Sequence, residues 1–332
     1  MVAVDANGAD QGPGAVAEGV RRSGLPVLLF GPASELSDAG PLAEVVDAPE
    51  AIKSGGESAA AAVRARRDAS IVQAARAVGD GRADALLSAG STGPTLAAGT
   101  LAIKRIRGVF RPALAVLLPL PNGDVLLLDA GASVEVRPEH LVQFAYMGAG
   151  FMTAVQRMER PRVGLLSVGE EAGKGTPDVL AAHERLTEGS LNFVGNVEGF
   201  DLPTSGADVI VTDGFTGNVA LKVLEATAKA MGAAVRDAIR SGAVSSLGGL
   251  LVKGKLAGLR DQLDPERAGG AILLGLRKPV VVAHGSFGPL GIESAVRLAQ
   301  RAVEEDMVGR TTAALDAAGA LRSASAATVA GP

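Results

Sequence analysis

The sequence predicts an α/β protein built on a doubly wound, mostly parallel β-sheet. Short, continuously apolar runs recur along the 332 residues, and helical stretches separate many of them. A strand that is apolar at every position is buried on both faces, which is typical of a parallel sheet covered by helices on each side. In addition, a polar residue beside a glycine follows six of these runs, where the binding loops of such sheets lie.

Nine apolar segments are predicted to be strands, because their length and richness in β-branched residues favour strand over helix. In chain order, they are Val2–Val4, Leu25–Phe30, Val45–Val46, Ala85–Leu87, Ala113–Leu118, Val125–Leu128, Val163–Leu166, Val209–Val211 and Val280–Val282.

Seven longer segments are predicted to be helices from their apolar spacing and from proline or glycine near their first turns. They are Gly14–Ser23, Ala69–Val78, Pro94–Arg107, Pro138–Met158, Pro177–Leu186, Asn218–Arg240 and Gly291–Ala318.

Residues 83–100 pass from an apolar strand through a glycine-rich turn into a helix. Gly90 and Gly93 free the backbone of this turn, and Ser91 or Thr92 is suited to cap the helix that follows. Such a junction points unpaired N–H groups and the positive end of a helix dipole at one place, which favours an anion. A glycine-rich turn alone is equally compatible with an ordinary strand-to-helix connection.

Polar residues beside glycines follow strands throughout the chain, and we expect these loops to converge on one site. That site is rich in backbone donors and hydroxyl groups, which suit phosphate or another oxyanion. The loops are Asp5–Gly8, Ser88–Gly90, Asp129–Gly131, Ser167–Gly169, Asp213–Gly214 and His284–Gly285.

Composition excludes several functional classes. Hydrophobic residues make up 47% of the chain, but no apolar run approaches the roughly 18 residues of a membrane-spanning helix. A formal net charge of −4 argues against general binding of nucleic acid. The absence of cysteine excludes disulfides, thiolate nucleophiles and thiolate metal sites. The chain opens on a strand rather than a basic leader, so a cytoplasmic protein is expected.

The ordered motifs of the chain resemble one family, the bacterial phosphate acyltransferases that convert acyl-(acyl carrier protein) and inorganic phosphate into acyl phosphate. The resemblance covers most of the chain. It is carried by VDANGADQGP, VRARRDAS, LLSAGSTGP, RPALAVLLP, LLLDAGASVEVRPEHLVQFAYMG, PRVGLLSVGEEAGKGT, NFVGNVEG, VTDGFTGNVALK and VVVAHGS.

This resemblance implies an α/β/α sandwich similar to phosphotransacetylases and isopropylmalate-type dehydrogenases. It implies a homodimer that uses no cofactor and no metal. The acyl phosphate product would serve a downstream glycerol-3-phosphate acyltransferase in phospholipid synthesis, at the inner face of the cell membrane. Residues 1–320 are expected to form a single unit with a crevice between two lobes, and residues 321–332 a disordered tail.

The sequence departs from the family pattern in three places. Gln11 occupies the position of a usual histidine in the first loop, and the segment from Phe30 to Ala51 is shorter than usual. Ser91 and Ser133 replace asparagines that are often present, and each keeps a polar group.

Three residues are assigned catalytic roles, because attack of a phosphate oxygen on a thioester needs charge stabilisation and proton delivery but no protein nucleophile. Lys174 lies among glycines after a strand, where it can reach phosphate or the thioester oxygen. His284 is suited to protonate a leaving thiolate, and Asp213 to orient donors. The alternatives are a solvated lysine, a structural histidine and ordinary turn chemistry for the aspartate.

The phosphate ligands are predicted to be Ser88, Ser91 and Thr92, with helix capping as the alternative. The remaining predicted substrate-binding residues come from the loops that follow the strands. They are Asn7, Gly8, Gly90, Gly93, Asp129, Gly131, Ser133, Gly169, Glu170, Gly175, Thr176, Gly214, Thr216, Gly217 and Asn218.

Two other functions are compatible with the sequence. One is an isopropylmalate-type, NAD-dependent dehydrogenase, although the chain lacks a GxGxxG turn after its first strand and an evident aspartate cluster for a divalent metal. The other is a membrane-docked scaffold of lipid synthesis that has lost the chemistry, for which Gln11 is the support.

Residues 243–263 are predicted to form a protruding amphipathic segment. Leu247, Leu251, Leu259 and Leu263 recur at multiples of four, and basic residues lie among them. Such a segment is suited to contact an anionic membrane surface or an acidic carrier protein reversibly. A helix packed on the partner of a dimer is the alternative.

Overall fold

The computed structural model describes residues 1–53, 55 and 58–322. Within these residues, eleven strands form a single sheet. The strands are β1 (Val2–Asp5), β2 (Val27–Gly31), β3 (Ala43–Asp47), β4 (Ala85–Ser88), β5 (Ala113–Leu118), β6 (Val125–Leu128), β7 (Val163–Leu166), β8 (Phe193–Val197), β9 (Val209–Val211), β10 (Ala271–Leu274) and β11 (Val280–Val282).

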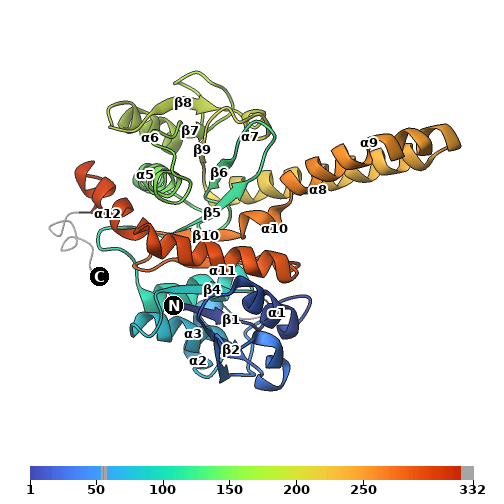
Figure 1. Cartoon of the computed structure of the whole chain (residues 1–332). Helices are drawn as coiled ribbons and strands as arrows, with labels where there is room; N and C mark the ends of the chain where they lie inside the picture. Colours follow the sequence, from blue (N-terminus) through green and yellow to red (C-terminus); the bar gives the residue numbers. More distant parts are fainter. Residues whose placement is uncertain (54, 56–57, 323–332) are drawn as a thin grey trace.

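Helices cover both faces of this sheet, as Figure 1 shows. Short 3-10 turns occupy Ala33–Glu35 and Ser37–Ala39, and a π-helical turn occupies Gly99–Ile103. The α-helices are α1 (Pro13–Ser23), α2 (Ala59–Ala65), α3 (Ser70–Gly79), α4 (Thr92–Ala98), α5 (Pro138–Ala154), α6 (Pro177–Thr187), α7 (Asp201–Thr204), α8 (Gly214–Arg240), α9 (Ala243–Gln262), α10 (Pro265–Ala268), α11 (Pro289–Glu304) and α12 (Met307–Ala317).

The strand order is β3-β2-β1-β4-β11-β10-β5-β6-β9-β7-β8. Strands β1, β2, β3, β4 and β11 are parallel to one another, as are β6, β7, β8 and β9. Each of the three antiparallel strand pairs contains β5 or β10. The predicted α/β class and the doubly wound, mostly parallel sheet are therefore confirmed.

The antiparallel pairs reverse the sheet between its two parallel sets. Strand β10 is antiparallel to both β11 and β5, and β5 is antiparallel to β6. Three reversals make β6–β9 run opposite to β1–β4 and β11. The carboxyl ends of β1, β4 and β11 therefore lie at one edge of the sheet, here called the first edge, and those of β6, β7 and β9 lie at the opposite, second edge.

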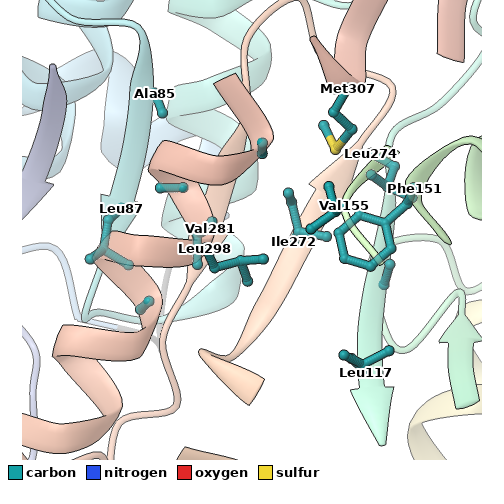
Figure 2. Packing of buried hydrophobic residues seen from close by; sticks show 14 of the residues in the cluster. Ala85, Leu87, Leu117, Phe151, Val155, Ile272, Leu274, Val281, Leu298 and Met307 are labelled. Carbon is teal, nitrogen blue, oxygen red and sulfur yellow. The ribbon is translucent and has the colours of Figure 1, made fainter. Parts of the chain in front are cut away.

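The hydrophobic core forms two layers, one on each face of the sheet, because alternate residues of a strand point to opposite faces. Leu87 of β4 lies in the layer shared with α1, α5 and α11, whereas its neighbour Leu86 lies in the layer shared with α3 and α4. Figure 2 shows part of the first layer, where Phe151 of α5 and Leu298 of α11 approach the strands. Continuous apolar strands thus bury side chains on both faces.

Helices α8 and α9 form a hairpin that projects from the body of the protein (Figure 1). The two helices contact each other where the Ser246 hydroxyl donates to the Ile239 carbonyl at 3.2 Å. No residue of α9 is buried, and Leu251 is 83% exposed. The apolar side of this hairpin has no partner among the described residues.

Several predicted boundaries were wrong. Strands β8 and β10 were missed, since β8 contains Gly195 and the polar Asn196, and β10 follows two glycines. The single helix expected over Gly291–Ala318 is two helices, because Asp306 adopts a φ of 46° and caps α12. The helix expected to reach Arg107 ends at Ile103, where Lys104 adopts a φ of 70°.

The predicted disordered tail begins with two residues that the structure places. Leu321 packs against the first core layer, and the Arg322 amide donates to the Gly108 carbonyl at 3.0 Å. Residues 323–332 lie outside the described residues.

Candidate functional site

The loops after β1 and β4 meet around the buried carboxylate of Asp5 at the first edge. Its two oxygens accept hydrogen bonds from the hydroxyls of Ser70 at 2.6 Å and Ser88 at 2.9 Å. The Ser88 hydroxyl also accepts from the Gly90 amide at 3.1 Å, and the Asn7 side chain donates to Ser70 at 2.9 Å. Asp5 therefore fixes the conformation of the glycine-rich turn.

Burial raises the pKa of Asp5 from 3.8 to about 6, although hydrogen bonds from Ser70, Ser88 and the Asn7 amide oppose the rise. The sequence placed Asp5 in a loop expected at the site but gave it no role of its own, and Ser70 was not named as a site residue. The position of Asp5 at the last residue of a strand was an available signal, whereas Ser70 follows from the packing of α3 against β1.

The glycine-rich turn itself is tightly packed. Gly8 adopts a φ of 95°, and a Cβ on it would lie 2.8 Å from the Gly90 Cα. Ser91 is the N-cap residue of α4, but its side chain makes no capping hydrogen bond. Ser91, Thr92 and Gly93 therefore line the turn, whereas the Ser88 hydroxyl is occupied inside the protein.

His284 lies at the same edge, in the loop after β11. Its Nδ1 is 2.8 Å from the Ser286 hydroxyl and accepts from the Ser286 amide. The Gln11 side chain donates to the Ser286 carbonyl at 3.3 Å, so the residue that replaces the usual histidine lies beside the loop of His284.

Asp129 organises the second edge. Its buried carboxylate accepts from the amides of Leu114, Gly131, Ala132 and Ser133 at 2.6–3.1 Å. Burial raises the pKa of Asp129, and these hydrogen bonds oppose the rise. Asp129 therefore holds the loop between β6 and α5 in one conformation.

The start of α8 packs directly on this loop. The Gly214 amide donates to the Ser133 carbonyl at 2.8 Å, and a Cβ on Gly217 would overlap the Asp129 carbonyl oxygen. Asp213 is the N-cap residue, because it accepts from the amides of Phe215 and Thr216 and from the Thr216 hydroxyl. The capping alternative therefore explains every hydrogen bond that the Asp213 carboxylate makes with the described residues.

Lys174 lies in the loop after β7, also at the second edge. Its carbonyl accepts from the Ser167 hydroxyl at 3.0 Å and from Asn196 at 3.2 Å, and its amide donates to the Glu171 carbonyl at 2.9 Å. The side chain is exposed, and its ammonium group has no hydrogen-bond or ion-pair partner within the described ranges. The loop thus presents a cation on a fixed backbone, and Thr176 caps the helix that follows.

The topology divides the six loops between the two edges, so their convergence on one site stays a prediction. No hydrogen bond or ion pair among the described residues joins the two edges. The first edge holds Asn7, Gly8, Ser88, Gly90, Ser91, Thr92, Gly93 and His284. The second edge holds Asp129, Gly131, Ser133, Gly169, Glu170, Lys174, Gly175, Thr176, Asp213, Gly214, Thr216, Gly217 and Asn218.

The segment that leads into β5 is rich in positive charge. A hollow of ≈ 480 Å³ lies beside Phe110 and is lined in part by Lys104, Arg105, Arg107 and Arg322. The described residues contain no group of three or more His, Asp or Glu side chains placed to hold a metal ion.

Comparison with known proteins decides the family. Residues 1–310 match the family model described as "Fatty acid synthesis protein". A "Phosphate acyltransferase" from Lactococcus lactis subsp. cremoris (strain SK11) is 41% identical over 320 residues, covering 93% of this chain and 96% of that protein. Another from Anaeromyxobacter sp. (strain Fw109-5) is 42% identical over 343 residues, covering 100% and 95%. The chain belongs to the phosphate acyltransferase family.

Solved structures share the fold of this phosphate acyltransferase family member at low sequence identity. A phosphotransacetylase from Streptococcus pyogenes aligns with a TM-score of 0.61 at 18% identity, covering 92% of this chain and 94% of that one. A 4-hydroxythreonine-4-phosphate dehydrogenase from Klebsiella pneumoniae aligns with a TM-score of 0.53 at 15% identity, covering 91% and 99%. The expected likeness to phosphotransacetylases and dehydrogenases is confirmed at the level of the fold.

Membership of the phosphate acyltransferase family makes the chain an enzyme, a transferase of acyl groups in fatty acid or lipid synthesis. The dehydrogenase alternative therefore keeps only the fold in its support. Family membership likewise disfavours the catalytically inactive scaffold, because the curated relatives are named as acyltransferases.

Proposed function

We propose that the enzyme transfers a fatty acyl group from acyl-(acyl carrier protein) to inorganic phosphate. Family membership supports the acyl transfer to phosphate, and the resemblance described above supplies the donor. The observation that carries the proposal in the structure is Lys174, an unpaired cation on a fixed loop beside the start of α6. No cofactor is required.

The reaction balances without a protein nucleophile. An oxygen of HPO₄²⁻ attacks the thioester carbonyl carbon, the C–S bond breaks, and the proton of the phosphate passes to the leaving sulfur. Negative charge develops on the carbonyl oxygen in between, and a cation placed there stabilises the transition state more than the bound substrates. Lys174 is the residue that we assign to this charge.

The other two catalytic candidates have positioning roles in this proposal. Asp213 caps α8, whose start contacts the Asp129 loop through the Gly214 amide. His284 lies at the first edge, where its Nδ1 accepts from the Ser286 amide beside Gln11, so we assign it to the Gln11 loop rather than to the leaving sulfur. The remaining residues of the two edges are proposed to bind the substrates.

We further propose that residues 1–320 act as one unit, supported by the single sheet that runs through both halves. The proposed partners are acyl carrier protein, a second copy of the chain and a downstream glycerol-3-phosphate acyltransferase. None of the helices in the described ranges is both long and apolar enough to cross a membrane. The proposed location is the cytoplasm, with reversible contact between the exposed α9 and an anionic membrane surface.

The purified enzyme, incubated with long-chain acyl-(acyl carrier protein) and phosphate, is expected to form a product that hydroxylamine converts to a hydroxamate. The yield of hydroxamate is expected to depend on the presence of phosphate. A hydroxamate yield that is the same without phosphate, or no hydroxamate at all, contradicts the proposed reaction.

A further inference from the structure

We propose that Arg111 and Arg137, together with Lys174, bind the inorganic phosphate of the reaction at the second edge. Neither arginine was assigned to the site from the sequence. The inference rests on the proposed function and deepens it, because it names the residues that hold one substrate.

Arg111 is held in place by the residues on both sides of it. The Phe110 amide donates to the Gln143 side chain of α5 at 2.9 Å, and the Phe110 ring lies 5.5 Å from the ring of His140. Three residues after Arg111, the Leu114 amide donates to Asp129 at 2.9 Å. The backbone of Arg111 is therefore fixed between α5 and the Asp129 loop, and its side chain is exposed.

Arg137 is the N-cap residue of α5, four residues after Ser133. Its amide donates to Nδ1 of His140 at 3.1 Å, so Nδ1 is the unprotonated nitrogen of that ring. Burial lowers the pKa of His140, and the positive charges of Arg111 and Arg137 lower it further. Arg137 therefore contacts this imidazole ring through its amide, and Arg111 follows Phe110 in the chain, whose ring contacts the same imidazole.

The loop of Lys174 follows β7, which is parallel to β6 and separated from it by β9, so this loop and the loop that leads to Arg137 leave the same edge of the sheet. Glu139, in the first turn of α5, accepts from Arg185, in the last turn of α6, at 3.2 Å. The charge of Asp178, in the first turn of α6, acts on His140 as well. Lys174 is two residues before the N-cap residue of α6, on the same edge of the sheet as the two arginines.

The carboxylates of this region do not neutralise the three cations by ion pairing. Asp129 and Asp213 are occupied by backbone amides, and Glu139 pairs with Arg185. The Glu171 carboxylate and the aliphatic part of the Lys174 side chain both lie next to Gly169, but the carboxylate makes no ion pair with the Lys174 ammonium group. Among the described residues, none of the three cations is within ion-pair distance of a carboxylate.

The alternative phosphate site, the glycine-rich turn, is less suited to a dianion. The Ser88 hydroxyl there is committed to Asp5 and Gly90, and the turn lies next to a buried carboxyl group rather than a cation. Arginine binds phosphate through paired, charge-assisted hydrogen bonds, and lysine adds a point charge. The second edge supplies both kinds of residue, the two arginines and Lys174.

Binding of inorganic phosphate to the full chain, measured by calorimetry without the acyl donor, tests this assignment. Arg111→Ala and Arg137→Ala are each expected to weaken phosphate binding by about tenfold or more, since each removes a charge-assisted contact. Arg160→Ala is the matched control. Arg160 is an exposed arginine just before β7, at the opposite edge, and its loss is expected to change binding by less than about twofold.

Three results would overturn the assignment. They are unchanged phosphate binding in both arginine variants, no phosphate binding by the wild-type chain, or loss of binding in Ser91→Ala/Thr92→Ala alone. If the arginine variants lose binding while the wild-type enzyme forms no hydroxamate from its acyl donor, the phosphate site stands and the proposed donor fails.

Discussion

The Ser88 hydroxyl and the Asp5 carboxylate are joined by a 2.9 Å hydrogen bond between the ends of two parallel strands. Because Ser88 also accepts from the Gly90 amide, the carboxylate fixes the glycine-rich turn through one intermediate. The Asp5 side chain is only 3% exposed, so its ionisation is coupled to folding.

Asp5→Asn is expected to remove a pH dependence of stability. The pKa of Asp5 rises from 3.8 to about 6 on folding, so the folded state binds this proton more tightly. The stability that the proton provides is complete below about pH 4 and is lost as the pH rises through 6, a change of up to ~3 kcal/mol. Chemical unfolding at pH values from 4 to 7 measures it.

The difference between wild type and variant is the informative quantity, because other groups titrate in both proteins. The free energy of unfolding of the wild type should fall relative to that of Asp5→Asn between pH 4 and 6. Parallel curves for the two proteins would show that Asp5 has an ordinary pKa.

Gly217→Ala is expected to destabilise the enzyme by about 2 kcal/mol or more, because the new methyl group would overlap the Asp129 carbonyl oxygen. The start of α8 would have to move away from the Asp129 loop, so activity should fall as well. Thermal unfolding and hydroxamate formation measure the two effects.

Gly232→Ala, in the same helix, is the control. A Cβ at Gly232 meets no atom within 4 Å, and alanine favours a helix over glycine by up to about 1 kcal/mol. This variant should be as stable as the wild type or more stable. Equal losses in the two variants would refute the close contact at Gly217.

Leu251→Glu with Leu259→Glu is expected to abolish sedimentation of the enzyme with anionic vesicles. The two side chains are 83% and 45% exposed on α9, and glutamate removes apolar contact and adds repulsion. Dimer formation and activity on short-chain acyl-(acyl carrier protein) should be retained.

Leu42→Glu, at a leucine that is 54% exposed outside the hairpin, controls for added negative charge. Loss of the dimer in the double variant would favour the alternative in which α9 packs on a partner chain. Vesicle binding equal to that of the wild type would exclude α9 as the anchor.

The fold was predictable because short, continuously apolar runs such as Leu126–Leu128 are typical of strands buried on both faces of a sheet. The direction of each strand was not, since β10 was too short and too close to glycines to be recognised. Without β10, the reversals between β11 and β6 are invisible, and the loops of Ser88 and Lys174 seem to share one edge.

Some of the candidate site residues could be predicted from the sequence, and others could not. Asp129 and Asp213 follow strands in the sequence, and both organise the loops there. Arg111 and Arg137 carry no local signal, because their proximity depends on the packing of Phe110 against His140 of another element. Such long-range contacts follow from the tertiary structure alone.

The turnover of Lys174→Ala tests the central claim most directly. Hydroxamate formation is measured at saturating phosphate and donor, with thermal unfolding of the variant as the control for folding. The Lys174 side chain is exposed and its backbone makes the contacts that hold the loop, so the melting temperature should be unchanged. We predict a loss of turnover of about a hundredfold or more, because the cation acts on charge that develops in the transition state. A loss of about tenfold or less would contradict this role and leave Lys174 as a positioning residue.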